Sequence, residues 1–223
     1  MARMARVMLE GWPFHITHRG NHRKAVFSSD GDREDYLELL GRYAKHFEMA
    51  IWAYCLMPNH VHLLVVGQQR SSIAKAIGNA HREFSRRQNQ ERGVTGHSWA
   101  NRYFSTPLDE SHVWAAVRYV ELNPLRAGLV RRATDHGWSS ARAHAGLVSD
   151  SLLDPGRPFP GPVSDWSAWL GIGLEEEAQQ LLRRNTRTGH PTGSEEFVSD
   201  IGRRLGRAVS SRRPGPPRRG QQL

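Results

Sequence analysis

The stretch MPNHVHLLVV, at positions 57–66, constrains the fold of this chain more than any other part of the sequence. Its apolar and β-branched residues predict a buried strand over 60–66, and side chains alternate between the two faces of a strand. His60 and His62 therefore share one face, about 7 Å apart, while Val61 points to the other. Two imidazoles on one rigid face can bind a single metal ion. The alternative is a pair of histidines satisfied by hydrogen bonds at a sheet edge.

A second stretch, RYVELNPLRAGLV at 118–130, offers residues that could complete such a site. Tyr119 and Asn123 are four positions apart, so they share one face of the helix predicted over 109–122. Asn123 precedes Pro124, which disfavours helical angles, so we expect the helix to end there and a short turn to follow over 125–130. If this helix packs on the histidine-bearing sheet, Asn123 adds an amide oxygen to the two imidazoles. Such a donor set leaves positions open and suits Mg²⁺ or Mn²⁺ bound jointly with a phosphate oxygen.

Tyr119 is then the candidate catalytic residue, placed to attack phosphorus. Phenol has a pKa of about 10, so phenolate is accessible near a cation and is also a tolerable leaving group. The alternative is that Tyr119 is a half-buried core residue. The sequence contains no GxxxxGK[ST] phosphate loop, no paired CxxC and no GxSxG elbow. We expect no small-molecule substrate.

The order of predicted elements indicates the fold class. Strands are expected at about 12–19, 50–57, 60–66 and 99–106, and the first two helices from about 30 and over 72–91. This order predicts an α+β, ferredoxin-like sandwich, an antiparallel sheet with helices on one face. A small C-terminal helical appendage would follow.

The composition divides the chain further. We expect a main domain at 1–149, a Pro/Gly-rich linker at 150–164, a small helical accessory region at 165–208 and a basic disordered tail at 209–223. Thr192 and Glu195 form a candidate capping box for the last helix of the accessory region.

The net charge of +9 is concentrated in the main domain, where 20 basic and 13 acidic side chains give +7. This excess indicates a polyanionic partner, above all nucleic acid. The candidate DNA-binding residues are Arg19, Lys75, Arg82, Arg86, Arg102, Arg118 and Arg126. For any one of these cations, the alternative is a solvated surface position.

Cys55 is the only cysteine, so no intramolecular disulfide can form, which fits a reducing compartment. No apolar run approaches the roughly 20 residues that span a bilayer, and the N-terminal residues contain no apolar segment typical of a signal peptide. We therefore expect a cytoplasmic, nucleoid-associated protein without a membrane partner.

Four motifs, in order, resemble the REP-associated tyrosine transposases, relatives of the single-strand HUH transposases. They are HITHRGNHRKAVF (15–27), DREDYLELL (32–40), MPNHVHLL (57–64) and YVELNPLRAGLV (119–130), within a resemblance that covers about 7–145. The resemblance implies a ferredoxin-like catalytic domain, a Mg²⁺ or Mn²⁺ ion, and cleavage of single-stranded DNA near hairpins formed by repeated extragenic palindromes. The products would be a 5′-phosphotyrosine and a free 3′-OH.

Carried over by position, His60 and His62 resemble the metal histidines of that family and Tyr119 its nucleophile. Asn123 stands where relatives often have glutamine as the third ligand, and Val61 stands where they have a bulkier residue. A non-catalytic hairpin-binding protein or repressor with the same fold is the second interpretation. Formation of a covalent adduct with hairpin DNA would distinguish the two.

Overall fold

The computed structural model describes residues 6–156 and 165–209. Its first part contains β1 (Pro13–Arg19), η1 (Asn21–Arg23), α1 (Asp30–His46), β2 (Met49–Met57), β3 (His60–Gly67), α2 (Ser72–Arg92) and β4 (Phe104–Pro107). The four strands form one antiparallel sheet in the order β2-β3-β1-β4. This βαββαβ arrangement confirms the predicted ferredoxin-like fold.

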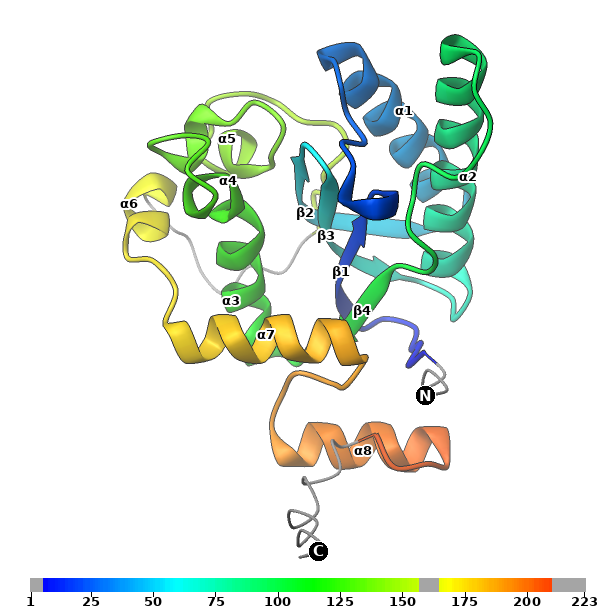
Figure 1. The fold of residues 1–223 in the computed structure, drawn as a ribbon. Coiled ribbons are helices and arrows are strands. Elements are labelled where there is room, and N and C mark those ends of the chain that lie inside the picture. Colours follow the sequence, from blue (N-terminus) through cyan, green and yellow to red (C-terminus); the bar gives the residue numbers. More distant parts are fainter. Residues whose placement is uncertain (1–5, 157–164, 210–223) are drawn as a thin grey trace, which may run out of the picture.

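The sheet is covered on both faces, whereas the sequence led us to expect helices on one (Figure 1). α1 and α2 pack on the face that carries Phe14, Ile16 and Leu63. α3 (Glu110–Glu121) packs on the other face, which carries Cys55 and Leu64. β3 carries apolar side chains on both faces. Helices on only one face of the sheet would leave the apolar side chains of the other face in water.

Two local features fix the start of α1 and of β3. Ser29 and Asp32 form a capping box that starts α1, because each side chain accepts a hydrogen bond from the backbone N–H of the other. Pro58 and Asn59 join β2 to β3 in a tight hairpin, in which Met57 pairs with His60. This register fixes His60 and His62 on the α3 side of the sheet.

The fourth strand is shorter than predicted. β4 covers only Phe104–Pro107, and Trp99 instead forms an isolated bridge with Gly20. Asn101 has a positive φ of 39°, which interrupts the extended chain between the two. Arg102 therefore lies in a loop that precedes the strand.

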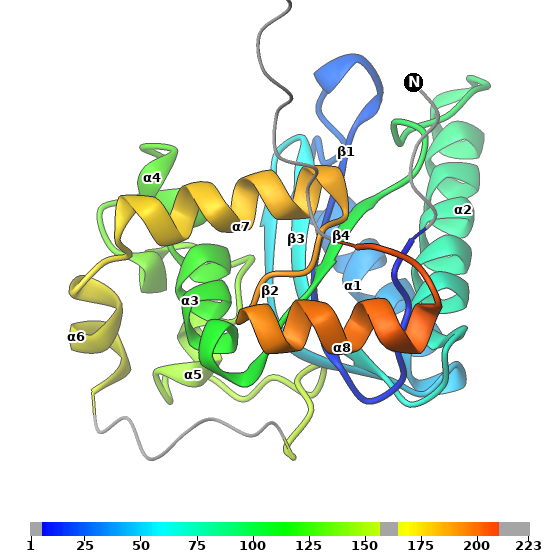
Figure 2. The ribbon, with the colours of Figure 1, turned by 90° about the horizontal axis from the view of Figure 1, so that it is seen from below.

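The remaining helices lie beyond the sheet. They are α4 (Asn123–Arg126), η2 (Ala133–Asp135), α5 (Ala141–His144), α6 (Trp166–Gly171), α7 (Glu176–Thr188) and α8 (Glu195–Leu205). α7 packs against β4 and α3, and Figure 2 shows it beside both. α8 is capped by Ser194, which accepts the Phe197 N–H, so the predicted cap at Thr192 is wrong. Thr192 is instead buried in contact with β4.

Two predicted segments fall mainly outside this description. Residues 157–164 of the predicted linker and residues 210–223 of the predicted tail lie outside the described residues. Within 6–156 and 165–209, no helix is both long and apolar enough to cross a membrane. Cys55 is fully buried on β2, as expected of a small core residue.

Candidate active site

Three imidazoles meet on the α3 side of the sheet. His60 and His62 come from β3, with ring centroids 5.0 Å apart and planes at 76°. β1 adds His15, whose ring stacks on that of His62 at 5.3 Å and 8°. His15 was not among the site residues predicted from the sequence. Alternation along β1 puts His15 and Thr17 on one face of that strand. The sequence does not show that β1 pairs with β3, so it does not predict that this face also carries His60 and His62.

Each of the two β3 histidines has one ring nitrogen hydrogen-bonded to a neighbouring side chain. His60 Nδ1 lies 2.6 Å from Asn59 Oδ1, and His62 Nδ1 lies 3.0 Å from His15 Nε2. Within the described residues, no hydrogen bond reaches Nε2 of either His60 or His62. Those two nitrogens are therefore free to bind a ligand.

Burial keeps these imidazoles neutral. It lowers the pKa of His60 to about 4, with Arg19 contributing, and that of His15 to about 3, with Arg126 contributing. Burial, and then the neighbouring His15, also hold the pKa of His62 well below its ordinary value. Because only a neutral imidazole carries a lone pair, His60 and His62 are in the form that binds metal at neutral pH.

Tyr119, from the end of α3, lies against the same histidines. Its ring meets His62 edge-on at 5.5 Å and His15 at 5.3 Å. Its hydroxyl oxygen accepts a hydrogen bond of 3.2 Å from Nε of Arg183, and the guanidinium of Arg126 lies 4.4 Å from the ring centroid. A cation at the phenolic oxygen stabilises negative charge there.

Asn123 lies one turn after Tyr119, at the start of α4. α3 ends at Glu121 and only Leu122 separates the two helices, so the turn predicted over 125–130 begins as a helix. Pro124 explains this, because proline is well tolerated in the first turn of a helix. Asn123 Nδ2 donates to the Tyr119 carbonyl at 2.9 Å. The amide oxygen is then the atom of this side chain that remains for a ligand.

These residues line a depression of about 440 Å³, which we call the site hollow. Its lining includes His60, His62, Tyr119 and Asn123, and also Arg19, Arg126, Arg183 and Arg187. Among the residues that the structure describes, no aspartate or glutamate lines it. Four guanidinium groups without a carboxylate favour an anionic ligand.

No group of three or more His, Cys, Asp or Glu side chains is arranged to hold a metal ion in the described parts of the chain. His15 does not add a third imidazole ligand, because its Nε2 is used on His62. A metal ion in the site hollow would have two imidazoles and an amide as protein ligands.

A comparison with protein-family models matches residues 10–123 to the family described as "Transposase IS200 like". The chain belongs to the IS200-like transposase family. Among solved structures, it is similar to a REP-associated tyrosine transposase bound to a REP hairpin, at 16% identity and a TM-score of 0.52. That match covers 73% of this chain and all of the other, and it shows the same fold.

A protein assigned as a transposase from Deinococcus radiodurans R1 also matches, at 19% identity and a TM-score of 0.38, over 54% of this chain and 96% of the other. A comparison with curated proteins gave no match. The family match over residues 10–123 confirms the family resemblance predicted from the four motifs.

Helix α7 of this transposase lies beyond the residues that match the family, yet it completes the site hollow. It contributes Arg183, Thr186 and Arg187, none of which was predicted as a site residue from the sequence. Their spacing of three and four places them on one helix face. That pattern is visible in the sequence, but an arginine-bearing helix face is usually solvated, and only the packing of α7 on β4 and α3 brings it to Tyr119.

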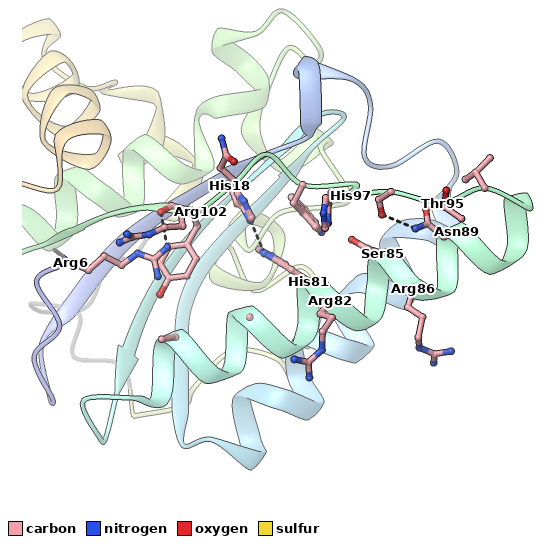
Figure 3. A pocket seen from close by; sticks show the side chains of 17 residues that line it. Arg6, His18, His81, Arg82, Ser85, Arg86, Asn89, Thr95, His97 and Arg102 are labelled. Carbon is pink, nitrogen blue, oxygen red and sulfur yellow. Dashed lines mark hydrogen bonds between the residues drawn. The ribbon is translucent and has the colours of Figure 1, made fainter. Parts of the chain in front are cut away.

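The transposase has a second depression on the other side of the sheet, of about 580 Å³, which we call the arginine hollow (Figure 3). Arg82 and Arg86 lie along α2, and Arg6 and Arg102 lie together near the start of β4. In the described part of the chain, no acidic residue lines this hollow either. It therefore brings together three of the predicted DNA-binding residues, whereas Arg19 and Arg126 lie in the site hollow.

Arg82 and Arg86 differ from their neighbours on the same helix. Their hydrogen bonds go to the neutral side chains of Asn79 and Gln90. Arg87, by contrast, forms ion pairs with Asp35 and Glu83 on the α1 side. One face of α2 is therefore neutralised and the other keeps its positive charge.

The two remaining predicted DNA contacts lie in neither hollow. Lys75 is exposed on α2. The guanidinium of Arg118 lies 4.1 Å from the ring centroid of Trp169, against α6. The structure thus separates these two residues from the other candidates.

Proposed function

We propose that this transposase cleaves and rejoins single-stranded DNA beside hairpins by transesterification, with Tyr119 as the nucleophile. The observation that carries the proposal is the position of the Tyr119 phenol. Its ring lies edge-on to His62 at 5.5 Å, and its oxygen accepts a hydrogen bond from Arg183. Tyr103 also shares a cationic hollow with two buried imidazoles, but both ring nitrogens of His18 and of His81 are hydrogen-bonded. Tyr119 instead lies beside imidazoles whose Nε2 atoms have no partner among the described residues. Family membership supports DNA strand cleavage and rejoining as the reaction class.

The donor set of the site hollow fits a divalent ion. His60 and His62 offer two lone pairs on Nε2, and Asn123 offers an amide oxygen, which leaves other positions of a six-coordinate Mg²⁺ or Mn²⁺ for water and phosphate. When bound, such an ion would act as a Lewis acid toward the scissile phosphate. Neutral ligands also leave the full charge of the ion available to the substrate.

In the proposed reaction, the Tyr119 phenol loses its proton to water and its oxygen attacks the scissile phosphorus. A bond forms between phosphorus and the phenolic oxygen, the bond from phosphorus to the 3′ oxygen breaks, and that oxygen gains a proton from water. The chain then holds the 5′ phosphate as a phosphotyrosine. Arg183 stabilises the phenolate in both directions, because rejoining is the reverse attack by a 3′-OH.

The two hollows suggest how the DNA lies. The successive residues His18 and Arg19 line the arginine hollow and the site hollow respectively, so the two depressions lie on opposite sides of β1. We assign the single-stranded flank to the site hollow and phosphates of the hairpin to Arg82, Arg86 and Arg102 in the arginine hollow. The solved transposase of the same fold was bound to a REP hairpin, which supports this substrate class.

Replacing Tyr119 with phenylalanine tests the nucleophile. The change removes only the phenolic oxygen, so hairpin binding should persist while cleavage and the covalent adduct are lost. The assay mixes protein, Mn²⁺ and hairpin DNA labelled at either end and runs a denaturing gel. The native chain should give a shifted band that carries only the label 3′ to the cut.

Tyr54→Phe is the matched control, because Tyr54 is also buried, lines neither hollow and donates its hydroxyl proton to Asp150, so the band should stay unchanged. Persistence of the band in Tyr119→Phe would assign the nucleophile to another residue. Cleavage without any band would indicate a hydrolytic nuclease. Hairpin binding by the native chain with neither cleavage nor adduct would favour the non-catalytic DNA-binding protein.

A further inference from the structure

A chain of hydrogen bonds leads from helix α7 to Nδ1 of His62, the ring nitrogen that does not face a ligand. Thr186 Oγ1 lies 2.7 Å from the backbone carbonyl oxygen of Leu182 and 2.7 Å from His15 Nδ1. His15 Nε2 lies 3.0 Å from His62 Nδ1. The side chains of Thr186, His15 and His62 are buried, so the hydrogen bonds that link them are shielded from bulk water.

The first link fixes the direction of the whole chain. Two oxygens at 2.7 Å repel unless a proton lies between them, and a carbonyl cannot donate, so the Thr186 hydroxyl donates to Leu182. A hydroxyl has a single proton, so Thr186 Oγ1 accepts the hydrogen bond from His15. The proton of His15 is therefore on Nδ1.

The second link transmits this choice. A buried neutral imidazole carries one N–H, so His15 Nε2 is an acceptor, and the N–H of His62 Nδ1 donates the hydrogen bond to it. His62 then has its lone pair on Nε2, the nitrogen without a partner among the described residues. In the opposite arrangement His62 would carry a proton on Nε2 and could not bind metal through that atom.

His60 reaches the same form by an unconnected route. Asn59 Nδ2 donates to the carbonyl of Arg23 at 3.1 Å, which orients the amide and turns Oδ1 toward His60. Asn59 Oδ1 then accepts from His60 Nδ1 at 2.6 Å. His60 also keeps its lone pair on Nε2, independently of α7.

We infer that Thr186 and His15 are positioning residues that hold His62 in its metal-binding tautomer, so that α7 prepares the metal site from outside the family-matched region. The tautomer follows from the hydrogen bonds alone, whereas its consequence for metal binding rests on the proposed function. Second-layer partners of this kind typically alter metal affinity by about 10- to 100-fold.

The test begins with the metal-free full chain. Two-bond ¹H–¹⁵N correlation spectra of the imidazoles distinguish a proton on Nδ1 from one on Nε2. Both His60 and His62 should carry it on Nδ1. A proton on Nε2 of His62 in the native chain would overturn the inference without any variant, even if Thr186 variants fail to fold.

Thr186→Val keeps the shape of the side chain and removes the hydroxyl. His15 can then place its proton on Nε2 and donate to His62, so the His62 signal should move toward the Nε2–H form while that of His60 stays. Mn²⁺ affinity, measured by the free-ion electron paramagnetic resonance signal, should fall about 10- to 100-fold. Thr186→Ser should restore both properties.

The outcomes separate the two proposals. An unchanged His62 tautomer in Thr186→Val overturns the positioning role of Thr186. A tautomer that changes as expected in a chain that never binds Mn²⁺ supports the positioning role and rejects His62 as a metal ligand. Loss of Mn²⁺ affinity in Thr186→Val without a change of tautomer would also overturn the inference.

Discussion

β1 contributes one histidine to each of two buried pairs, one on each face of the sheet: His15 meets His62 of β3, and His18 meets His81 of α2. The hydrogen bonds of the two pairs end differently. His18 Nδ1 lies 2.8 Å from His81 Nδ1, much as His15 meets His62 at 3.0 Å. The outer nitrogens of the first pair are both used: His18 donates to the Ala100 carbonyl, and His81 accepts from the Tyr36 hydroxyl. In the second pair, His62 Nε2 has no such partner within the described residues and lies in the site hollow.

Burial alone therefore does not distinguish the proposed metal ligand His62 from a structural histidine. Burial lowers the pKa of His18 and His81 as it does that of His15 and His62. The difference is the lone pair of His62 Nε2, which no described residue binds and which faces the site hollow. We therefore assign the His18–His81 pair to the structural core and the His15–His62 pair to the proposed active site.

The largest expected difference between the pairs is in catalysis. His62→Ala removes one of two imidazole ligands, and loss of several kcal/mol of transition-state stabilisation corresponds to a decrease of about 10³-fold in the cleavage rate. Hairpin binding should change little, because phosphate contacts by arginine supply most of the affinity. Rates on labelled hairpin DNA in Mn²⁺ measure the effect, and cleavage that persists in EDTA would contradict the metal role.

The reverse difference is expected in stability. His81→Ala leaves the Tyr36 hydroxyl and a nitrogen of His18 without their partner in the core, which should lower the free energy of unfolding by about 3 kcal/mol. Mn²⁺ affinity should stay at the native value in the folded variant. Urea titration and metal titration at 15 °C give the two numbers, and a large loss of Mn²⁺ affinity would show that the two pairs are not independent.

A smaller effect is expected on the pH dependence of the free energy of unfolding. The folded-state pKa values of His18 and His81 lie below the unfolded value of about 6.5, so protons bind preferentially to the unfolded chain as pH falls through that value. The free energy of unfolding is therefore highest above about pH 7 and falls toward acid. Each histidine lowers it by at most about 1.4 kcal/mol per pH unit.

His81→Gln removes one such group, so its stability should depend less steeply on pH than that of the native chain between pH 7 and 5. His97→Gln is the control, because His97 is exposed. Urea unfolding in EDTA avoids any contribution from bound metal. Identical slopes for the native chain and His81→Gln would mean that His81 is protonated in the folded state.

Strand alternation and helical spacing were sufficient to predict part of this site. They placed His60 with His62, and Tyr119 with Asn123, and the structure brings these four side chains into one hollow. Periodicity reports which face of its own element a residue occupies. It does not report which elements meet, so neither His15 nor Thr186 could be assigned from the sequence.

The same limit applies to the prediction of the fold. The order of elements gave the ferredoxin-like sheet, but the α3 layer on the second face depends on long-range packing. β4 is shorter than its β-rich sequence suggested, because Asn101 turns the chain and Trp99 stacks on His81 at 4.1 Å instead of entering the sheet. Tertiary contacts overrode the local propensity of this segment.

The smallest predicted effect concerns the charge of the arginine hollow. Arg82→Gln and Arg86→Gln each remove a cation that forms no ion pair with a described residue, so each should weaken hairpin binding by about 1 kcal/mol, regardless of sequence, and lower the salt slope by about 0.7–0.9. Arg87→Gln is the matched control on the same helix, because Asp35 and Glu83 already neutralise Arg87. Fluorescence anisotropy with one hairpin at several salt concentrations measures both quantities. The cleavage rate at saturating DNA should be native in all three variants, since none of these side chains lines the site hollow. If Arg87→Gln weakened binding as much as Arg82→Gln, general charge would govern affinity, and the arginine hollow would have no special part in holding the DNA.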